Sequence, residues 1–200
     1  MDRKKEIILV TAELASQRGL SNVSMSLIAE KLGIKKPSLY NHFRSREEII
    51  SAMYQYFRDR AKEKASLGDI DMGEAVKGKT MEEVLQGAVS DYIRLTGDSE
   101  MFAFYKIIYS ERAVDPAAAM IMAEETKRMT AATKNLFYAL QVHGKMYADD
   151  IDMAALSFAM TVHGIMDYQL DCSCSGKTVS DGMLKGYIKW FCSQYEGGRK

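Results

Sequence analysis

The hydrophobic residues of the chain recur at intervals of three and four positions, the spacing that places them on one side of an α-helix. Only two prolines interrupt the 200 residues, and serine, threonine, aspartate or glycine stands at most points where the periodicity starts or stops. The pattern predicts an all-α protein, with helices over residues 3–18, 25–32, 37–43, 46–64, 81–96, 99–113, 116–143, 152–173 and 179–195. Residues 65–79 carry three glycines and no apolar period, so they are expected to form a loop or hinge.

Two short predicted helices lie within residues 25–44, on either side of a glycine. Ser24 is placed to cap the first helix, Gly33 can adopt the positive φ of a tight turn, and Pro37 suits the first turn of the second helix. The residues expected to face inward are Ile28, Ala29, Leu32, Ile34, Leu39 and Phe43. This arrangement predicts a helix-turn-helix.

The charge distribution gives this motif a function. Residues 35–46 read KKPSLYNHFRSR, with four cations and no acid, and such a segment offers cations to phosphates and short polar groups to base edges. The formal net charge of zero conceals a division, because residues 1–46 carry nine Lys and Arg against four acids, whereas residues 47–200 carry 18 against 23. A nucleic-acid partner is therefore expected at the N-terminal end only.

Residues 24–50, SMSLIAEKLGIKKPSLYNHFRSREEII, resemble the N-terminal signature of the tetracycline-repressor (TetR) family of transcription regulators. The resemblance covers about residues 3–60, and the remainder matches the family in helix pattern only. It implies a three-helix DNA-binding domain over residues 1–46, a connecting helix over 47–64 and a helical ligand-binding and dimerisation domain over 65–200.

The same resemblance implies which residues contact DNA: Met25, Ser26, Lys35, Lys36, Pro37, Ser38, Tyr40, Asn41, His42 and Arg46. Arg46 stands where the family places a basic residue that grips a phosphate with help from the helix dipole. Met25 replaces a threonine that is common at its position, which removes one phosphate hydrogen bond. Asn41 could pair with adenine, and Tyr40 could contact a phosphate, a sugar or a thymine methyl. For His42, a structural role and a phosphate contact remain alternatives.

The remaining two thirds of the sequence hold no catalytic or metal-binding motif, so neither enzyme activity nor a cofactor or metal is expected. Cys172, Cys174 and Cys192 are too few and too clustered for a disulfide framework, and reduced thiols are expected, with a thiol sensor or soft-metal site as the alternative. No apolar run is long enough to cross a bilayer or to form the core of a signal peptide. The sequence thus predicts a cytoplasmic protein without a membrane partner.

Methionine is abundant, with 14 residues, and it accompanies many aromatic side chains after residue 72. Such side chains fill cores, and they also line adaptable apolar pockets. Because the resemblance implies a ligand cavity, an apolar or aromatic small molecule is the expected effector. The candidate lining residues are Met101, Phe104, Tyr105, Ile108, Phe137, Met160, His163 and Met166, although a histidine at the spacing of His163 is more commonly a core residue.

The last two predicted helices are apolar on more than one face, so one face is left for a partner. We expect them to pair with their copies about a two-fold axis. The candidate interface residues are Leu156, Ala159, Val162, Met183, Tyr187, Trp190 and Phe191. A homodimer would bring two short recognition helices to a near-palindromic operator in double-stranded DNA.

The sequence therefore predicts a sequence-specific transcription regulator, by family analogy a repressor, that a small ligand releases from its operator. The alternative is a DNA-binding adaptor whose C-terminal domain binds a protein partner or only dimerises, without a small effector.

Overall fold

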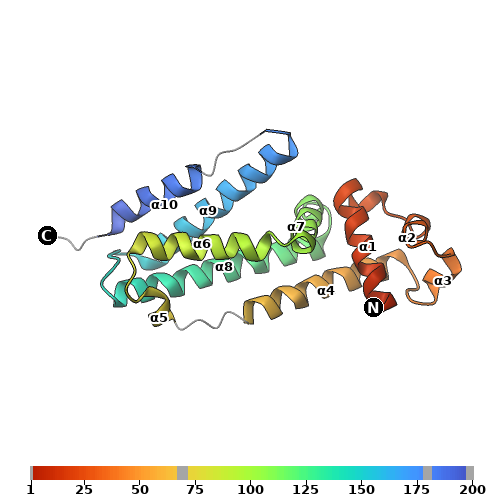
Figure 1. Cartoon of the computed structure of the whole chain (residues 1–200), viewed down its shortest axis with the longest axis horizontal. Helices are drawn as coiled ribbons and strands as arrows, with labels where there is room; N and C mark the ends of the chain where they lie inside the picture. The colour runs from red at the N-terminus through yellow and green to blue at the C-terminus, as the bar shows by residue number, and fades with distance from the viewer. Residues whose placement is uncertain (1, 67–71, 178–181, 197–200) are drawn as a thin grey trace. The chain divides into compact units, whose positions relative to one another are not determined.

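A computed structural model describes residues 2–66, 72–177 and 182–196, and within these ranges all the regular structure is helical (Figure 1). This confirms the predicted all-α class. The elements are α1 (Arg3–Arg18), the 3₁₀ turn η1 (Leu20–Asn22), α2 (Met25–Lys31), α3 (Lys36–Tyr40), α4 (Arg46–Ser66), α5 (Met72–Val76), α6 (Met81–Thr96), α7 (Ser99–Glu111), α8 (Pro116–Val142), α9 (Ile151–Cys174) and α10 (Gly182–Tyr195).

Local capping chemistry fixes most of the helix starts. The Ser24 hydroxyl accepts from the amide of Leu27 at 3.2 Å, as its position before α2 predicts. Thr80 and Glu83 form a reciprocal capping box, in which each side chain accepts from the backbone amide of the other residue. Helix starts that depend on such short-range bonds are therefore readable from sequence.

Three elements differ from the predicted ranges. Helix α3 ends at Tyr40 rather than near residue 43, because the amides of His42 and Phe43 both turn back to the carbonyl of Leu39. Helix α5 lies inside the segment predicted as a loop, and Val76 at its end is fully buried, so tertiary burial stabilises a turn that has no apolar period. The predicted start of the last helix near residue 179 lies outside the described residues.

The chain forms two compact units. The first comprises Met1–Asp69 and Arg94–Ala123, and thus contains α1 to α4, α7 and the beginning of α8. In it α1 packs against both α4 and α7. Phe57 of α4 stacks on Phe104 of α7 with ring centroids 4.6 Å apart, at the centre of the core. These contacts assign α7 to the N-terminal helices, whereas the sequence places all residues after 64 in a separate domain.

The second unit comprises Ile70–Ile93 and Glu124–Lys200. Its helices α9 and α10 are neighbours that run in opposite directions (Figure 1). The centre of this unit is aromatic, and the rings in contact are those of Phe137, Phe158, Tyr187, Phe191 and Tyr195. In the described part of the chain, no helix has the length and apolar character needed to cross a membrane.

Candidate nucleic-acid interface

The turn between α2 and α3 is built by backbone bonds around one glycine. Gly33 has φ +65°, and the amide of Ile34 donates to the carbonyl of Ala29 at 3.0 Å. A residue with a side chain is strained at this φ, which is why glycine occupies the position. The turn sets α3 across the end of α2, and the two helices pack against each other. The predicted helix-turn-helix is therefore present.

Helix α3 has one buried side and one exposed side. Leu39 and Phe43 are buried in the core of the first unit, as their positions in the sequence predict. The side chains left in solvent are those of Lys35, Lys36, Pro37, Ser38, Tyr40 and Asn41. This surface, residues 35–41 without Leu39, is called the α3 face below. It presents two cations, a hydroxyl, a phenol and an amide, the groups that bind phosphates and base edges.

The remaining predicted DNA contacts on α2 and after α3 are placed differently. Ser26 is exposed on the first turn of α2. The side chain of Met25 is buried in the core, so the structure corrects its assignment as a contact residue; only its backbone is left near the helix start. His42 directly follows Asn41 and is half-buried. Its intermediate exposure is compatible with both alternatives, a structural role and a phosphate contact.

Arg46 also differs from its predicted role. Its guanidinium donates to two backbone carbonyls, from Nε to Val23 at 2.6 Å and from Nη2 to Leu20. Nη1 lies 3.8 Å from the carboxylate of Glu47. Arg46 thus joins the first turn of α4 to the segment between α1 and α2, and its donors are directed inward rather than to a phosphate.

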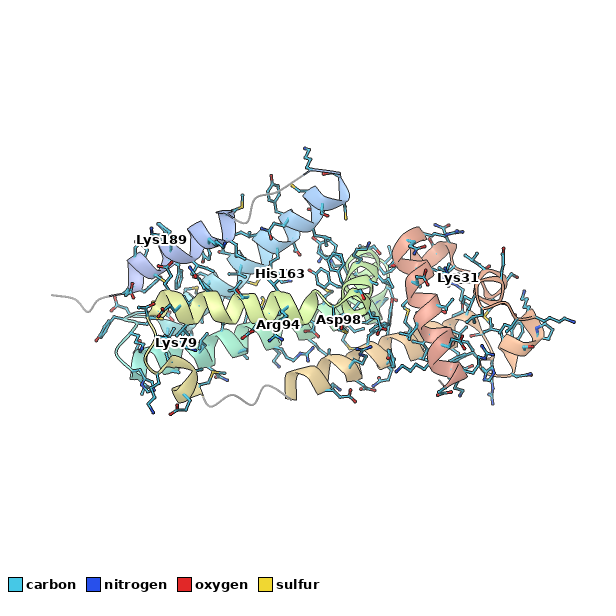
Figure 2. The ribbon with its side chains drawn as sticks, viewed as in Figure 1. Lys31, Lys79, Arg94, Asp98, His163 and Lys189 are labelled. Carbon is cyan, nitrogen blue, oxygen red and sulfur yellow. The ribbon has the colours of Figure 1, made fainter. Side chains whose placement is uncertain are left out.

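Two cations beside the α3 face were not singled out from the sequence. Arg44 is exposed in the loop before α4, and Lys4 of α1 lies over the Phe43 ring at 5.6 Å. The position of Arg44 in the basic run 35–46 was the available sequence signal for a DNA contact. The neighbouring residues do not show that Arg44 is exposed while Arg46 bonds inward. Lys31, labelled in Figure 2, is different, since it pairs with Glu13 of α1 at 3.0 Å and fixes α2 to α1.

The predicted ligand-lining residues are divided between the two units. Phe104 and Ile108 are buried in the first core, and Phe137 is buried in the second, so these three are packing residues. Met101 and Tyr105 are half-buried beside the first core. Met160 is exposed, and Met166 is half-buried beside the second core. Periodicity could not separate core from cavity here because both use the same apolar side chains.

His163, which the sequence names as a candidate ligand-lining residue, belongs to a polar group in the second unit (Figure 2). His163 Nδ1 is 3.3 Å from the carboxylate of Asp167, one turn later on α9, and both side chains are mostly buried. Burial and the charge of Asp167 raise the pKa of the Tyr92 phenol on α6. Tyr92 and Asp167 were missed from the sequence, although the i,i+4 spacing of His163 and Asp167 was the available signal.

The predicted dimer residues separate into two groups. Leu156, Met183 and Trp190 are 44, 48 and 57% exposed, and Tyr187 is half-buried. Ala159, Val162 and Phe191 are instead buried inside their own unit, which corrects their assignment as interface residues. Met153 and Met160 lie on the same exposed side of α9 as Leu156. We call Met153, Leu156, Met160, Met183 and Trp190 the α9–α10 face.

The three cysteines are free thiols. Cys172 and Cys192 are buried and Cys174 is exposed. Burial, with smaller contributions from Glu196 and Glu82, raises the pKa of the Cys192 thiol to about 12. A thiol with so high a pKa is unreactive at neutral pH, which weakens the case for Cys192 in a redox sensor.

Comparison with known proteins agrees with this geometry. A family model described as "Bacterial regulatory proteins, tetR family" matches residues 7–53, and one described as "AefR-like transcriptional repressor, C-terminal domain" matches residues 83–189. The chain is 37% identical over 46 residues to the HTH-type transcriptional regulator YobS of Bacillus subtilis, which is 23% of this chain and 24% of YobS. It is 33% identical over 57 residues to the HTH-type transcriptional repressor KstR2 of Mycolicibacterium smegmatis, 28% of either chain.

The matched stretches thus span about a quarter of these two curated relatives. Over nearly the whole length, the fold is similar to that of the ketosteroid transcriptional regulator KstR2 of Mycobacterium tuberculosis, with a TM-score of 0.63, 19% identity, and coverage of 98% of this chain and 96% of that one. The second family model alone spans more than half of the chain. The protein therefore belongs to the TetR family of transcriptional regulators, which are DNA-binding proteins and not enzymes.

Proposed function

We propose that the protein is a homodimeric repressor that binds a near-palindromic operator and is released from it by a small apolar or aromatic effector. The observation that carries this proposal is the α3 face. Its polar and cationic side chains are exposed to solvent, whereas Leu39 and Phe43 on the opposite side are buried in the core.

The α3 face divides into two kinds of contact. Lys35, Lys36 and the neighbouring Arg44 are suited to phosphates, which any DNA sequence supplies. Ser38, Tyr40 and Asn41 are short or planar polar groups, suited to base edges in the major groove. A five-residue helix reaches only a few base pairs, so one copy would discriminate weakly and two copies are needed for an operator.

The α9–α10 face supports the dimer. Its methionines, leucine and tryptophan form an exposed apolar surface on two adjacent antiparallel helices, and such surfaces mark interaction sites. Pairing α9 and α10 with their copies would bury this surface in a four-helix arrangement.

The effector is proposed for the second unit. Its helices combine an interior of aromatic and aliphatic side chains with the mostly buried polar group of Tyr92, His163 and Asp167. This mixture is typical of sites that bind an apolar molecule and orient it by one or two polar atoms. The name of the M. tuberculosis neighbour, a ketosteroid regulator, is in keeping with an effector of apolar character.

A mobility-shift experiment on the DNA that flanks the protein's own gene tests the proposal. We expect a specific complex whose affinity falls steeply between 50 and 200 mM salt, since phosphate contacts release counterions. Lys36→Ala should weaken binding to all fragments, whereas Asn41→Ala should change the preferred sequence. Absence of salt-sensitive binding to any such fragment would overturn the proposed function.

The alternative is a DNA-binding adaptor whose C-terminal part binds a protein or only dimerises. The alternative predicts that small apolar molecules do not change operator binding, either of the wild type or of a folded, DNA-binding His163→Leu variant. An effector-type regulator instead requires that a molecule weakens operator binding in the wild type and less so in this variant.

A further inference from the structure

The first unit contains a cavity of about 530 Å³ that the proposed effector does not occupy. It lies between α4, the η1 turn and the junction of α7 and α8, and all the residues around it belong to that unit. Its volume falls within the range of small-molecule sites, roughly 300–1,000 Å³. The residues proposed to bind the effector lie elsewhere, in the second unit.

The cavity has apolar walls that reach the solvent. Ile50 of α4 and Ile121 of α8 line it. Val114 and Met120, also in the lining, are 80 and 52% exposed, although the burial of such side chains is favourable. An apolar body in the cavity would therefore remove from water two side chains that the isolated chain leaves exposed.

Most of the charged groups in the lining are already engaged. Arg46 is bonded to the carbonyls of Leu20 and Val23 and lies beside Glu47. Asp115 accepts from the Tyr54 hydroxyl and from the amide of Ala117, both at 2.9 Å. The burial of Tyr54 and its hydrogen bond to Asp115 raise the pKa of that phenol, which stays neutral. Arg58, the other arginine of the lining, also interacts with another group of the protein.

Glu111 is the exception. Glu111 is a lining residue at the end of α7, and among the residues that the structure describes its carboxylate has neither a hydrogen bond nor an ion pair. A carboxylate at the wall of a partly apolar cavity is complemented by a cation, and the charge-assisted bond is stronger there than in bulk water.

We propose that this cavity binds a lipophilic ammonium ion, with the ammonium group on Glu111 and the apolar body against Ile50, Val114, Met120 and Ile121. The bound molecule would also touch Leu20 and Arg46, whose hydrogen bond joins α4 to the helix-turn-helix. Since the occupant bridges α4 and the α7–α8 junction in the folded protein only, its binding stabilises the first unit.

Calorimetric titration of the full-length protein with three probes of equal chain length tests the proposal: n-octylammonium, 1-octanol and n-octanoate. We expect one n-octylammonium per chain, bound at least about fivefold more tightly than 1-octanol, with n-octanoate the weakest of the three. Glu111→Gln should abolish the preference for the ammonium over the alcohol. Val114→Thr, which keeps the shape but adds a hydroxyl to an exposed position, should weaken all apolar probes.

Glu30→Gln on α2 is the matched control, because it removes one exposed carboxylate away from the cavity and should leave binding unchanged. Circular dichroism shows whether each variant is folded, and Val114→Thr still tests the cavity should Glu111→Gln fail to fold. Preferred binding of n-octanoate, or n-octylammonium binding that neither variant alters, would overturn the proposal. These measurements need no DNA, so they fail or succeed independently of the proposed repressor function.

Discussion

Arg44 and Arg46 lie two positions apart in one basic run, yet their side chains have different surroundings. Arg44 extends into solvent, and Arg46 donates to two carbonyl groups of the preceding segment. At the scale of the residue, the same charge therefore supports the fold at position 46 and is left in solvent, beside the proposed DNA surface, at position 44.

This difference gives a matched pair of variants. Arg46→Ala should lower the free energy of unfolding by about 1–2 kcal/mol, because the carbonyls of Leu20 and Val23 lose their donor. Arg44→Ala should leave stability unchanged and reduce the slope of log affinity against log salt by about 1. Urea denaturation and salt-dependent binding measure the two effects. A stable Arg46→Ala variant with a reduced salt slope would restore the phosphate role to Arg46.

The cysteines give a second residue-scale prediction. At pH 8 a thiol whose pKa is about 12 is almost entirely protonated, so Cys192 should resist iodoacetamide while the exposed Cys174 reacts. Raising the pH to 9.5 should leave Cys192 protected, since that pH is still far below its pKa. Mass spectrometry of the alkylated peptides measures both rates, and early modification of Cys192 would contradict its burial.

Residue roles that depend on local register were predictable, and those that depend on distant partners were not. The inward direction of Leu39 and Phe43 follows from helical spacing. The role of Arg46 depends on carbonyls 23 and 26 positions earlier, and nothing in the sequence indicates that approach. Family resemblance gave the opposite expectation for this residue.

At the scale of the element, the turn between α2 and α3 depends on a single backbone angle. Gly33 has φ +65°, and a Cβ built there meets no atom within 4 Å. Gly33→Ala should thus destabilise the first unit by about 1 kcal/mol through backbone strain alone, and Gly33→Asn by less, because asparagine tolerates this region. Thermal unfolding of both variants checks the order, and an equal loss in both would indicate a packing defect instead.

Helix boundaries were predictable where a cap or a glycine marks them, as at Ser24 and Thr80. Helix α5 was not, because five residues with an internal glycine offer no period, and the burial of Val76 is visible only in the folded unit. The assignment of α7 to the first unit is of the same kind, since Phe104 meets Phe57, which lies 47 positions earlier in the chain.

At the scale of the whole molecule, the α9–α10 face predicts a dimer that should dissociate when charged side chains are introduced into this face. The double change Leu156→Arg and Trp190→Arg should convert a dimer into a monomer of 22.5 kDa in light scattering, with unchanged helix content, because both side chains are exposed in the single chain. Operator affinity should fall with it, as each half-site is then bound alone.

Val142→Arg is the control for this change, since Val142 is 82% exposed on α8 and outside the α9–α10 face. Trp190 is the single tryptophan, so in the single variant Leu156→Arg, which keeps it, its emission reports on the same face and should shift to longer wavelength on dissociation. A double variant that stays dimeric would assign the interface to another surface.

The Arg46 bonds also determine where this regulator can be divided. A DNA-binding head cut after residue 45 would leave the carbonyls of Leu20 and Val23 exposed and would remove the α4 surface on which α1 packs. Chimeric regulators that exchange heads between family members should therefore place the junction beyond α4, and where α1 rests on α7 they should carry α7 with it. For this chain, the transferable part is a set of helices that sequence order separates, and not its first 46 residues.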